Sequence, residues 1–502
     1  MKTINSSQLL ILLAFVIFSG CKKEMKKDLS FNSQNYEIKT FEFEGKEYKV
    51  RAFENIVYVK KPIDTVYQCM NIYIPEEYFQ DKSIKNYDKE SAPIFFPNNV
   101  GGYMPAKPIS LTQDSQQRGP GDRTKATKMA LSKGYVVASP GARGRTNNNS
   151  FGVYTGKAPA DIVDLKAAVR YLKFNDSIIP GNSRKIISNG TSAGGAMSAL
   201  LGATGNSPDY EPYLKSLGAA EATDDIYAVS AYCPITNLDH ADAAYEWQFN
   251  GVNTYMKMGS MGQIDFHQKR TETLDTLTQS QIEVSDQLKM LFPAYVNSLK
   301  LRNNQNQLLT LYDNGNGNFK IWVGSYIIAS AQDVLNLGED LSKYEWITLN
   351  KGGNIVEKID FAGYVRYMKR MKTPPAFDAL DLSTGENQLF GNDSIDACHF
   401  TKYSFEHSTV ESFMAPELTI KMMNPIYYIG DPQSTCAKYW RIRHGTLDKD
   451  TSLAISVILA TKLKNSGINV NLEMPWNVPH SGDYDLRELF EWIESVCKKN
   501  GK

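Results

Sequence analysis

The chain has 502 residues, of which 55 are Lys or Arg and 55 are Asp or Glu, so its formal net charge is zero. This balance gives no electrostatic argument for a nucleic-acid partner or another strongly charged macromolecule. The length is sufficient for a large hydrophobic core and for more than one structural unit.

The N-terminus has the composition of an export signal. Lys2 supplies a positive charge, and residues 9–18 form an apolar run that is too short to span a bilayer. The following Ser19-Gly20-Cys21 resembles a bacterial lipobox, in which the cysteine is lipidated and becomes the first mature residue. We predict a lipoprotein signal peptide at 1–20, a tether at 21–34 and a membrane-anchored location in a bacterial cell envelope. An ordinary signal peptide with a coincidental cysteine is the alternative.

Six cysteines are scattered along the chain, and no two have the close spacing of a structural metal site. They are Cys21, Cys69, Cys233, Cys398, Cys436 and Cys497. If Cys21 carries lipid, an odd number remains, so at least one thiol is free. The sequence predicts neither a metal ion nor an organic cofactor.

The first half of the mature chain alternates between strand patterns and helix patterns. Residues 35–76 contain stretches of alternating polar and apolar residues that are typical of antiparallel strands. Short buried strands are predicted at 92–97, 134–140 and 226–232, and a helix is predicted at 160–173. Strands that alternate with helices indicate an α/β fold with a mostly parallel sheet and crossover helices.

A glycine-rich loop follows the strand at 92–97, in the sequence Asn98-Asn-Val-Gly-Gly-Tyr103. A glycine-rich loop in this position can donate a backbone N–H to an oxyanion hole. We therefore predict that Gly101 or Gly102 supplies this donor, although an ordinary turn explains either residue equally well. Arg143 and Arg145 follow the next strand and either brace the site or pair with carboxylates.

The sequence Gly190-Thr-Ser-Ala-Gly194 joins an apolar strand pattern to an Ala- and Leu-rich helix pattern. Gly-x-Ser-x-Gly in this context is the nucleophile elbow, a strained turn that exposes the serine hydroxyl at the edge of the sheet. Small residues are needed because larger side chains would collide with the neighbouring backbone. We predict Ser192 as a nucleophile and the N–H of Ala193 as an oxyanion donor. A glycine-rich turn capped by a serine is the alternative.

The strand–helix alternation stops between residues 233 and 424 and resumes after them. We interpret 233–424 as an inserted lid domain, flanked by two parts of one hydrolase core at 35–232 and 425–502. In the second part, strands are predicted at 438–443 and 468–474. Helices are predicted at 453–463 and 486–496.

A serine nucleophile needs a histidine base and an acid that orients the base. His480 lies in the loop after the last strand, and Asp448 lies in the loop after the preceding one. Parallel strands end at the same edge, so both side chains are predicted to meet Ser192. His444 is the rival base and Asp450 the rival acid. The alternatives are a helix cap for Asp448 and a surface position for His480.

These motifs resemble those of the bacterial subtype B tannases, which are α/β-hydrolases with a large lid inserted before the acid-bearing strand. The resemblance covers nearly the whole mature chain, with the elbow at 190–195, the acid loop at 448–450 and the histidine at 480. In that family a lid lysine, a lid glutamate and a second aspartate of the acid loop bind the three hydroxyls of a galloyl ring. The resemblance implies these roles for Lys372, Glu386 and Asp450.

The resemblance implies a serine carboxylesterase that hydrolyses galloyl esters of plant tannins through an acyl-enzyme. Two carboxylates and an ammonium can bind adjacent hydroxyls by charge-assisted hydrogen bonds, and such a site rejects rings that lack them. Three alternatives remain open, namely an esterase for ferulate or other hydroxyaryl esters, a serine peptidase of the same superfamily, and a non-catalytic glycan-binding lipoprotein. The predicted lipid anchor departs from the family pattern, because members of the family often have none.

Overall fold

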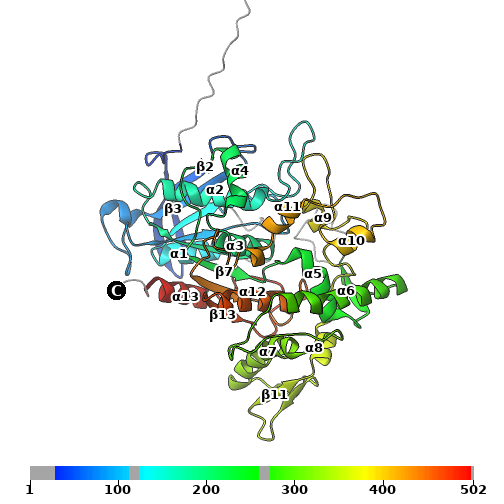
Figure 1. The fold of residues 1–502 in the computed structure, drawn as a ribbon. Helices are drawn as coiled ribbons and strands as arrows, with labels where there is room; N and C mark the ends of the chain where they lie inside the picture. Colours follow the sequence, from blue (N-terminus) through cyan, green and yellow to red (C-terminus); the bar gives the residue numbers. More distant parts are fainter. Residues whose placement is uncertain (1–28, 112–123, 259–271, 499–502) are drawn as a thin grey trace, which may run out of the picture.

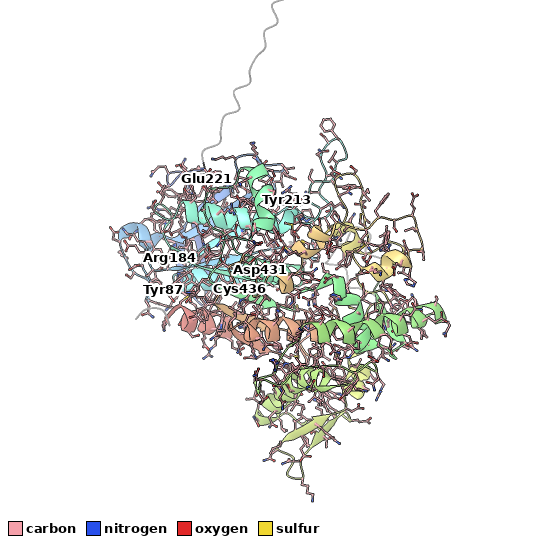
Figure 2. The ribbon with its side chains drawn as sticks, in the orientation of Figure 1. Tyr87, Arg184, Tyr213, Glu221, Asp431 and Cys436 are labelled. Atoms are coloured by element: carbon pink, nitrogen blue, oxygen red, sulfur yellow. The ribbon has the colours of Figure 1, made fainter. Side chains whose placement is uncertain are left out.

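The computed structural model describes residues 29–111, 124–258 and 272–498. The predicted signal peptide and its lipidation site at Cys21 lie outside these ranges. Within the described residues, no helix combines the length and the apolar composition needed to cross a bilayer. The five described cysteines are free thiols, including Cys436, which is labelled in Figure 2.

A nine-stranded sheet organises the molecule (Figure 1), with the strand order β1-β2-β3-β5-β4-β6-β7-β12-β13. The strands are β1 (Glu37–Phe43), β2 (Lys46–Val57), β3 (Cys69–Pro75), β4 (Pro93–Pro97), β5 (Val136–Pro140), β6 (Asn182–Thr191), β7 (Ala228–Tyr232), β12 (Tyr439–Arg443) and β13 (Asn469–Glu473). The first three strands and β5 pair antiparallel, and all pairs from β5 to β13 are parallel. The predicted α/β class with a mostly parallel sheet is therefore confirmed.

Five helices pack around the parallel strands. They are α1 (Thr124–Ser132), α2 (Ala160–Phe174), α3 (Ala193–Ala203), α12 (Leu453–Asn465) and α13 (Leu486–Lys498). Every residue of α3 is buried against β6 and β7. A Cβ at Gly202 would lie 2.3 Å from the Val229 side chain, so this position of α3 has no room for a side chain. Helix α1 is a short, lysine-containing element that the sequence patterns did not predict.

The segment between β7 and β12 adds no described strand to the central sheet. Its helices are α5 (Leu238–Phe249), α6 (Gln279–Ser298), α7 (Asn318–Asn336), α8 (Phe361–Met368), α9 (Gly385–Leu389), α10 (Lys402–Glu406) and α11 (Glu417–Met422). Two small sheets pair β8 (Thr254–Met258) with β9 (Glu272–Thr276) and β10 (Ile347–Leu349) with β11 (Val356–Ile359). Figure 1 shows α7, α8 and β11 projecting away from the central sheet.

Four parallel strands end in register at the edge where the predicted site lies. Thr191 of β6 pairs with Tyr232 of β7, Tyr232 pairs with Arg443 of β12, and Arg443 pairs with Glu473 of β13. The loops that follow these residues therefore leave the sheet side by side. This register brings together segments that are almost 300 residues apart in sequence.

Candidate active site

Ser192 occupies a strained turn between β6 and α3. Its φ is 62° and its ψ is −124°, a combination that non-glycine residues rarely adopt and that marks functional sites. A Cβ at Gly190 would lie 2.2 Å from the oxygen of Gly194, and one at Gly194 would lie 2.6 Å from the oxygen of Val100. The two glycines are therefore required by close backbone contacts, as the nucleophile-elbow pattern predicts.

Asn98 fastens the glycine-rich loop after β4 to this turn. Its buried amide donates hydrogen bonds to the Gly194 oxygen at 3.0 Å and to the Ser198 hydroxyl at 3.0 Å. Its backbone N–H donates to the Asn189 oxygen at 3.0 Å. The role of Asn98 has no signal in the sequence, because its partners become neighbours only when β4 pairs with β6.

Gly101 and Gly102 lie in the loop that Asn98 anchors. A Cβ at either position would meet no atom within 4 Å, so both glycines border open space. Gly102 has a φ of +55°, which favours glycine, and the next residue, Tyr103, has the same φ. The Tyr103 hydroxyl donates to the Ile235 oxygen at 2.8 Å, which ties the loop to the segment after β7. A substrate carbonyl can therefore approach the backbone of this loop.

His480 and Asp448 are directly hydrogen-bonded. The Nδ1 of His480 lies 2.8 Å from Oδ2 of Asp448, and the carboxylate is fully buried. Burial raises the pKa of Asp448, but the imidazoles of His480 and His444 and the local hydrogen bonds outweigh it and hold the pKa at about 2. Burial lowers the pKa of His480, but Asp448, Cys233 and Asp450 outweigh this effect and raise the pKa well above its ordinary value.

His444, the rival base, lies behind Asp448. Its Nε2 is 3.5 Å from Asp448 Oδ2, and its Nδ1 is 2.9 Å from the Ser456 hydroxyl. Because His444 is fully buried, its pKa is lowered by burial. This geometry suits a residue that supports Asp448 from within the protein, and it leaves His480 as the imidazole nearest the elbow loop.

The histidine loop packs against the elbow. A Cβ at Gly482 would lie 1.9 Å from Oγ1 of Thr191, the residue before Ser192. The Cys233 thiol donates to the Ser481 oxygen at 3.4 Å and lies 4.0 Å from His480 Nε2. Across the described residues, no hydrogen bond joins Ser192 Oγ to His480 Nε2. Catalytic hydrogen bonds often shorten only when substrate binds.

Lys372 and Asp450 come together beside the histidine. Lys372 Nζ lies 3.3 Å from Asp450 Oδ1, and Asp450 Oδ2 lies 3.6 Å from His480 Nε2. The ammonium also lies 4.0 Å from the centroid of the Phe377 ring. The backbone N–H of Lys372 donates to the Tyr245 hydroxyl at 3.0 Å. Two of the three residues that the family resemblance implies as ring ligands, Lys372 and Asp450, therefore lie side by side in the structure.

Glu386 lies in the first turn of α9, on the side of the site that carries the glycine-rich loop. A Cβ at the preceding Gly385 would lie 3.0 Å from the guanidinium carbon of Arg145, whose Nε donates to the Gly102 oxygen at 2.9 Å, so this turn of α9 lies near that loop. Thr384 caps the helix through a reciprocal pair of hydrogen bonds with Asn387. Within the described ranges, no ion pair joins Glu386 to Lys372.

One group of three candidate metal ligands occurs in the part of the chain that the structure describes. Cys233, Asp448 and His480 offer ligand atoms that lie within 4.8 Å of one another. Asp448 already binds the Nδ1 side of the imidazole, which is the arrangement that orients a general base. We therefore interpret the group as part of a hydrolytic site.

A strained serine after one parallel strand, an aspartate after a later strand and a histidine after the last strand follow the chain order of one class of enzymes. Together with the central sheet, these features define the protein as an α/β-hydrolase.

Comparisons with known proteins narrow this class. The BD-FAE family model, which describes α/β-hydrolases, matches residues 111–279. A tannase from Fusobacterium nucleatum is 53% identical, with a TM-score of 0.88 and coverage of 94% of this chain and 99% of that one. A tannin acyl hydrolase from Lactobacillus plantarum is 42% identical, with a TM-score of 0.88 and coverage of 93% and 99%. A tannin acyl hydrolase in complex with ethyl gallate is 42% identical, with a TM-score of 0.87 and the same coverage.

A search of curated proteins finds no match. The identity and nearly complete coverage of the solved structures show that the chain belongs to the tannase family, and it is a carboxylic ester hydrolase.

Proposed function

We propose that this protein hydrolyses galloyl esters through Ser192, His480 and Asp448. The observation that carries the proposal is the position of the Lys372–Asp450 pair, 3.6 Å from the imidazole that would act as the base. A relative of the same fold binds ethyl gallate, which is an ester of this type. The substrate class is therefore a small phenolic ester, including the galloyl esters of plant tannins.

The reaction begins when His480 Nε2 removes the Ser192 hydroxyl proton while Ser192 Oγ attacks the ester carbonyl carbon. Asp448 accepts the hydrogen bond from Nδ1 and stabilises the imidazolium that forms. The N–H of Ala193 and an N–H of the loop at Gly101 or Gly102 bind the negatively charged oxygen of the tetrahedral intermediate. The C–O bond to the alcohol breaks, and the alcohol leaves with the proton from Nε2.

The galloyl group is then bound to Ser192 as an ester. His480 removes a proton from a water molecule, which attacks the same carbonyl carbon. The Ser192 oxygen leaves and recovers its proton from the imidazolium, so that gallate is released and the enzyme returns to its starting state. No step requires a redox reaction or a second substrate other than water.

Three charged groups recognise the ring in this proposal. Asp450 accepts hydrogen bonds from ring hydroxyls, Lys372 donates to a hydroxyl oxygen, and Glu386 accepts from the hydroxyl nearest the glycine-rich loop. A ring without these hydroxyls would leave the half-buried charges unpaired, so the site discriminates against it. Tyr245 and Arg370 hold the backbone of Lys372 in place for this role.

Two variants test the assignment of the ring site. Glu386→Ala and Asp450→Asn are expected to lower kcat/KM for methyl gallate by about 10-fold to 100-fold, the usual effect of losing a hydrogen bond to a charged group. Their rates with p-nitrophenyl acetate, which has no hydroxylated ring, serve as the control at a pH above the pKa of His480, where the loss of Asp450 no longer changes the protonation of the imidazole. If both variants cleave methyl gallate as fast as the wild type, the ring site is assigned to the wrong residues.

The same assays separate the substrate classes. Side-by-side rates on methyl gallate and methyl ferulate distinguish a galloyl esterase from a feruloyl esterase. Ser192→Ala is expected to abolish both activities and the reaction with a fluorophosphonate probe.

The N-terminal prediction also enters as a proposal, in which Cys21 is lipidated and anchors the enzyme to a membrane of the cell envelope. Labelling with a radioactive fatty acid tests it. Label that remains in Cys21→Ser would contradict the proposed site.

The domain boundary at 233–424 likewise remains our proposal of a lid. It is supported by the absence of this segment's described strands from the central sheet. The segment also contains Lys372 and Glu386, two of the proposed ring ligands.

A further inference from the structure

Arg145 contacts the glycine-rich loop that borders the site. Its Nε donates a hydrogen bond to the Gly102 oxygen at 2.9 Å, and its backbone N–H donates to the Tyr103 oxygen at 2.8 Å. A Cβ at the preceding Gly144 would lie 2.3 Å from the carbonyl carbon of Met104. The chain around Arg145 is therefore packed directly against the loop, and its guanidinium holds a carbonyl next to the predicted oxyanion donor.

The other end of the same guanidinium contacts helix α9. Its Nη1 donates to Oε1 of Gln388, and a Cβ at Gly385 would lie 3.0 Å from the guanidinium carbon. Gln388 is itself oriented, because its Nε2 donates to Asp396 Oδ2 at 3.0 Å. Glu386 lies between these two contact points in the sequence, so Arg145 touches the helix on both sides of the proposed ring ligand.

The charge of Arg145 acts on Glu386 without a direct ion pair. Burial lowers the pKa of the guanidinium. The carboxylates of Glu386 and Asp396 oppose this effect only in part, so the pKa stays below its ordinary value. Among the described residues, Arg145 has no carboxylate oxygen within 4.0 Å, and its guanidinium donates to a carbonyl oxygen and to an amide oxygen. The oxygens of Glu386 therefore remain available to a ligand while a positive charge lies near them.

We propose that Arg145 is a positioning residue that holds the oxyanion loop and the ring-binding helix at a fixed spacing. This inference rests on the proposed function. In a galloyl ester the reacting carbonyl is conjugated with the ring, so the distance between the carbonyl oxygen and the ring hydroxyls is nearly constant. The protein groups that bind the two ends must match that distance, because a displacement of about 1 Å costs on the order of 100-fold in rate.

An arginine suits this role better than a lysine. The planar guanidinium offers donors in fixed directions, so Nε can bind Gly102 while Nη1 binds Gln388. A lysine at this position keeps the charge near Glu386 but has a single nitrogen on a flexible stem. Arg145→Lys therefore removes the pair of hydrogen bonds to Gly102 and Gln388, which we call the bridge, and preserves the charge.

Two variants and two substrates separate the halves of the bridge. Arg145→Lys is expected to lower kcat for p-nitrophenyl acetate by about 10-fold. Complete loss of an oxyanion donor costs about 10²-fold to 10³-fold, and a donor that is only displaced keeps part of its effect. The same variant is expected to lower kcat/KM for methyl gallate by about 100-fold, since both ends of that substrate are affected. Gln388→Ala, which removes the contact of Arg145 with α9 and leaves its contact with Gly102, is expected to leave the acetate rate within about 2-fold and raise KM for methyl gallate by about 10-fold.

The matched control is Arg184→Lys at an exposed position of β6, labelled in Figure 2, which should change neither rate. Thermal melting shows whether each variant is folded. Equal losses on both esters in Gln388→Ala, or unchanged rates in Arg145→Lys, would overturn the proposal. If the wild type cleaves the acetate and not methyl gallate, the proposed function fails. In that case the rate of Arg145→Lys with p-nitrophenyl acetate still tests whether Arg145 positions the glycine-rich loop, and an unchanged rate shows that it does not.

Discussion

At the residue scale, the site depends on a few groups whose charge is set by their immediate neighbours. Asp448 is fully buried and ionised, because two imidazoles and a backbone N–H surround it. His480 has the Asp448 carboxylate on Nδ1 and the Asp450 carboxylate 3.6 Å from Nε2. Two negative charges on opposite sides of one imidazole favour its protonated form, and that form cannot act as a base.

This arrangement predicts the pH dependence of the esterase. The pKa of His480 is raised above its ordinary value of 6.5, so kcat/KM should increase with pH as the imidazole loses its proton. This rising limb of the pH–rate profile should lie above pH 6.5. Asp450→Asn removes one of the carboxylates that raise this pKa, so the limb should move to lower pH. A pH–rate profile with p-nitrophenyl acetate, which does not use the ring site, measures the shift. An identical limb in both proteins would show that Asp450 does not act on the histidine.

The raised pKa of His480 also affects the stability of the folded protein. Activity increases as the pH rises, whereas this contribution to stability decreases. A histidine with a raised pKa in the folded state stabilises the protein when it is protonated, below the unfolded value of about 6.5. That stabilisation is lost as the pH rises through the folded pKa. The active, neutral form of His480 is therefore the less stabilising one.

At the element scale, helix α5 links the central sheet to the ring-binding residues. Its Glu246 forms a fully buried ion pair with Arg370, and Arg370 Nε donates to the Lys372 oxygen at 2.6 Å. Its Gln248 accepts hydrogen bonds from the Ser452 hydroxyl and the Leu453 N–H, at the start of the helix that follows the acid loop. One helix thus fixes the positions of both Lys372 and the loop that carries Asp450.

Glu246→Ala tests this link. Removal of one partner leaves Arg370 buried without its counter-charge, so the variant should lose about 3–5 kcal/mol of unfolding free energy. Denaturant titration measures the loss. Lys402→Ala, which breaks an exposed pair with Glu406, is the control and should change little. A Glu246→Ala protein as stable as the control would show that the buried pair contributes nothing.

At the scale of the whole molecule, the segment between β7 and β12 is joined to the sheet by direct hydrogen bonds. The Tyr364 hydroxyl donates to the Thr446 oxygen in the acid loop, and Trp322 Nε1 donates to the Thr461 hydroxyl of α12 at 3.1 Å. Buried apolar residues of the segment and of the sheet form one continuous cluster. These contacts connect the two parts more closely than a hinged domain would require.

We therefore expect the folded chain to unfold in one cooperative transition. Fluorescence reports tryptophans in both parts of the chain, with Trp247, Trp322 and Trp346 in the 233–424 segment and Trp440, Trp476 and Trp492 in the core, and far-ultraviolet circular dichroism reports the sheet and helices together. The two signals should change at the same denaturant concentration. Two separate midpoints would show that the segment unfolds independently and would favour a mobile lid.

The amino-acid sequence by itself determined the elements of the core and the loops that carry its chemistry. The elbow around Ser192 and the loops of Asp448 and His480 were predictable, because hydrophobic periodicity and glycine spacing are local signals. Helix α1 was not predicted, because a short helix with lysines in it has a weak pattern. The role of Lys372 depended on a family resemblance and not on its own surroundings in the sequence.

Only the tertiary structure decided which distant side chains meet. Asn98 binds the elbow, Asp450 pairs with Lys372, and Arg145 bridges Gly102 and Gln388. Each of these contacts joins residues separated by more than 40 positions. The contact of Asn98 with the elbow follows from the pairing of β4 with β6, whereas the contacts of Lys372 and Gln388 depend on how the segment between β7 and β12 packs on the core. Periodicity describes the face that a residue presents, whereas the pairing of strands and the packing of α5 and α9 determine the residue opposite it.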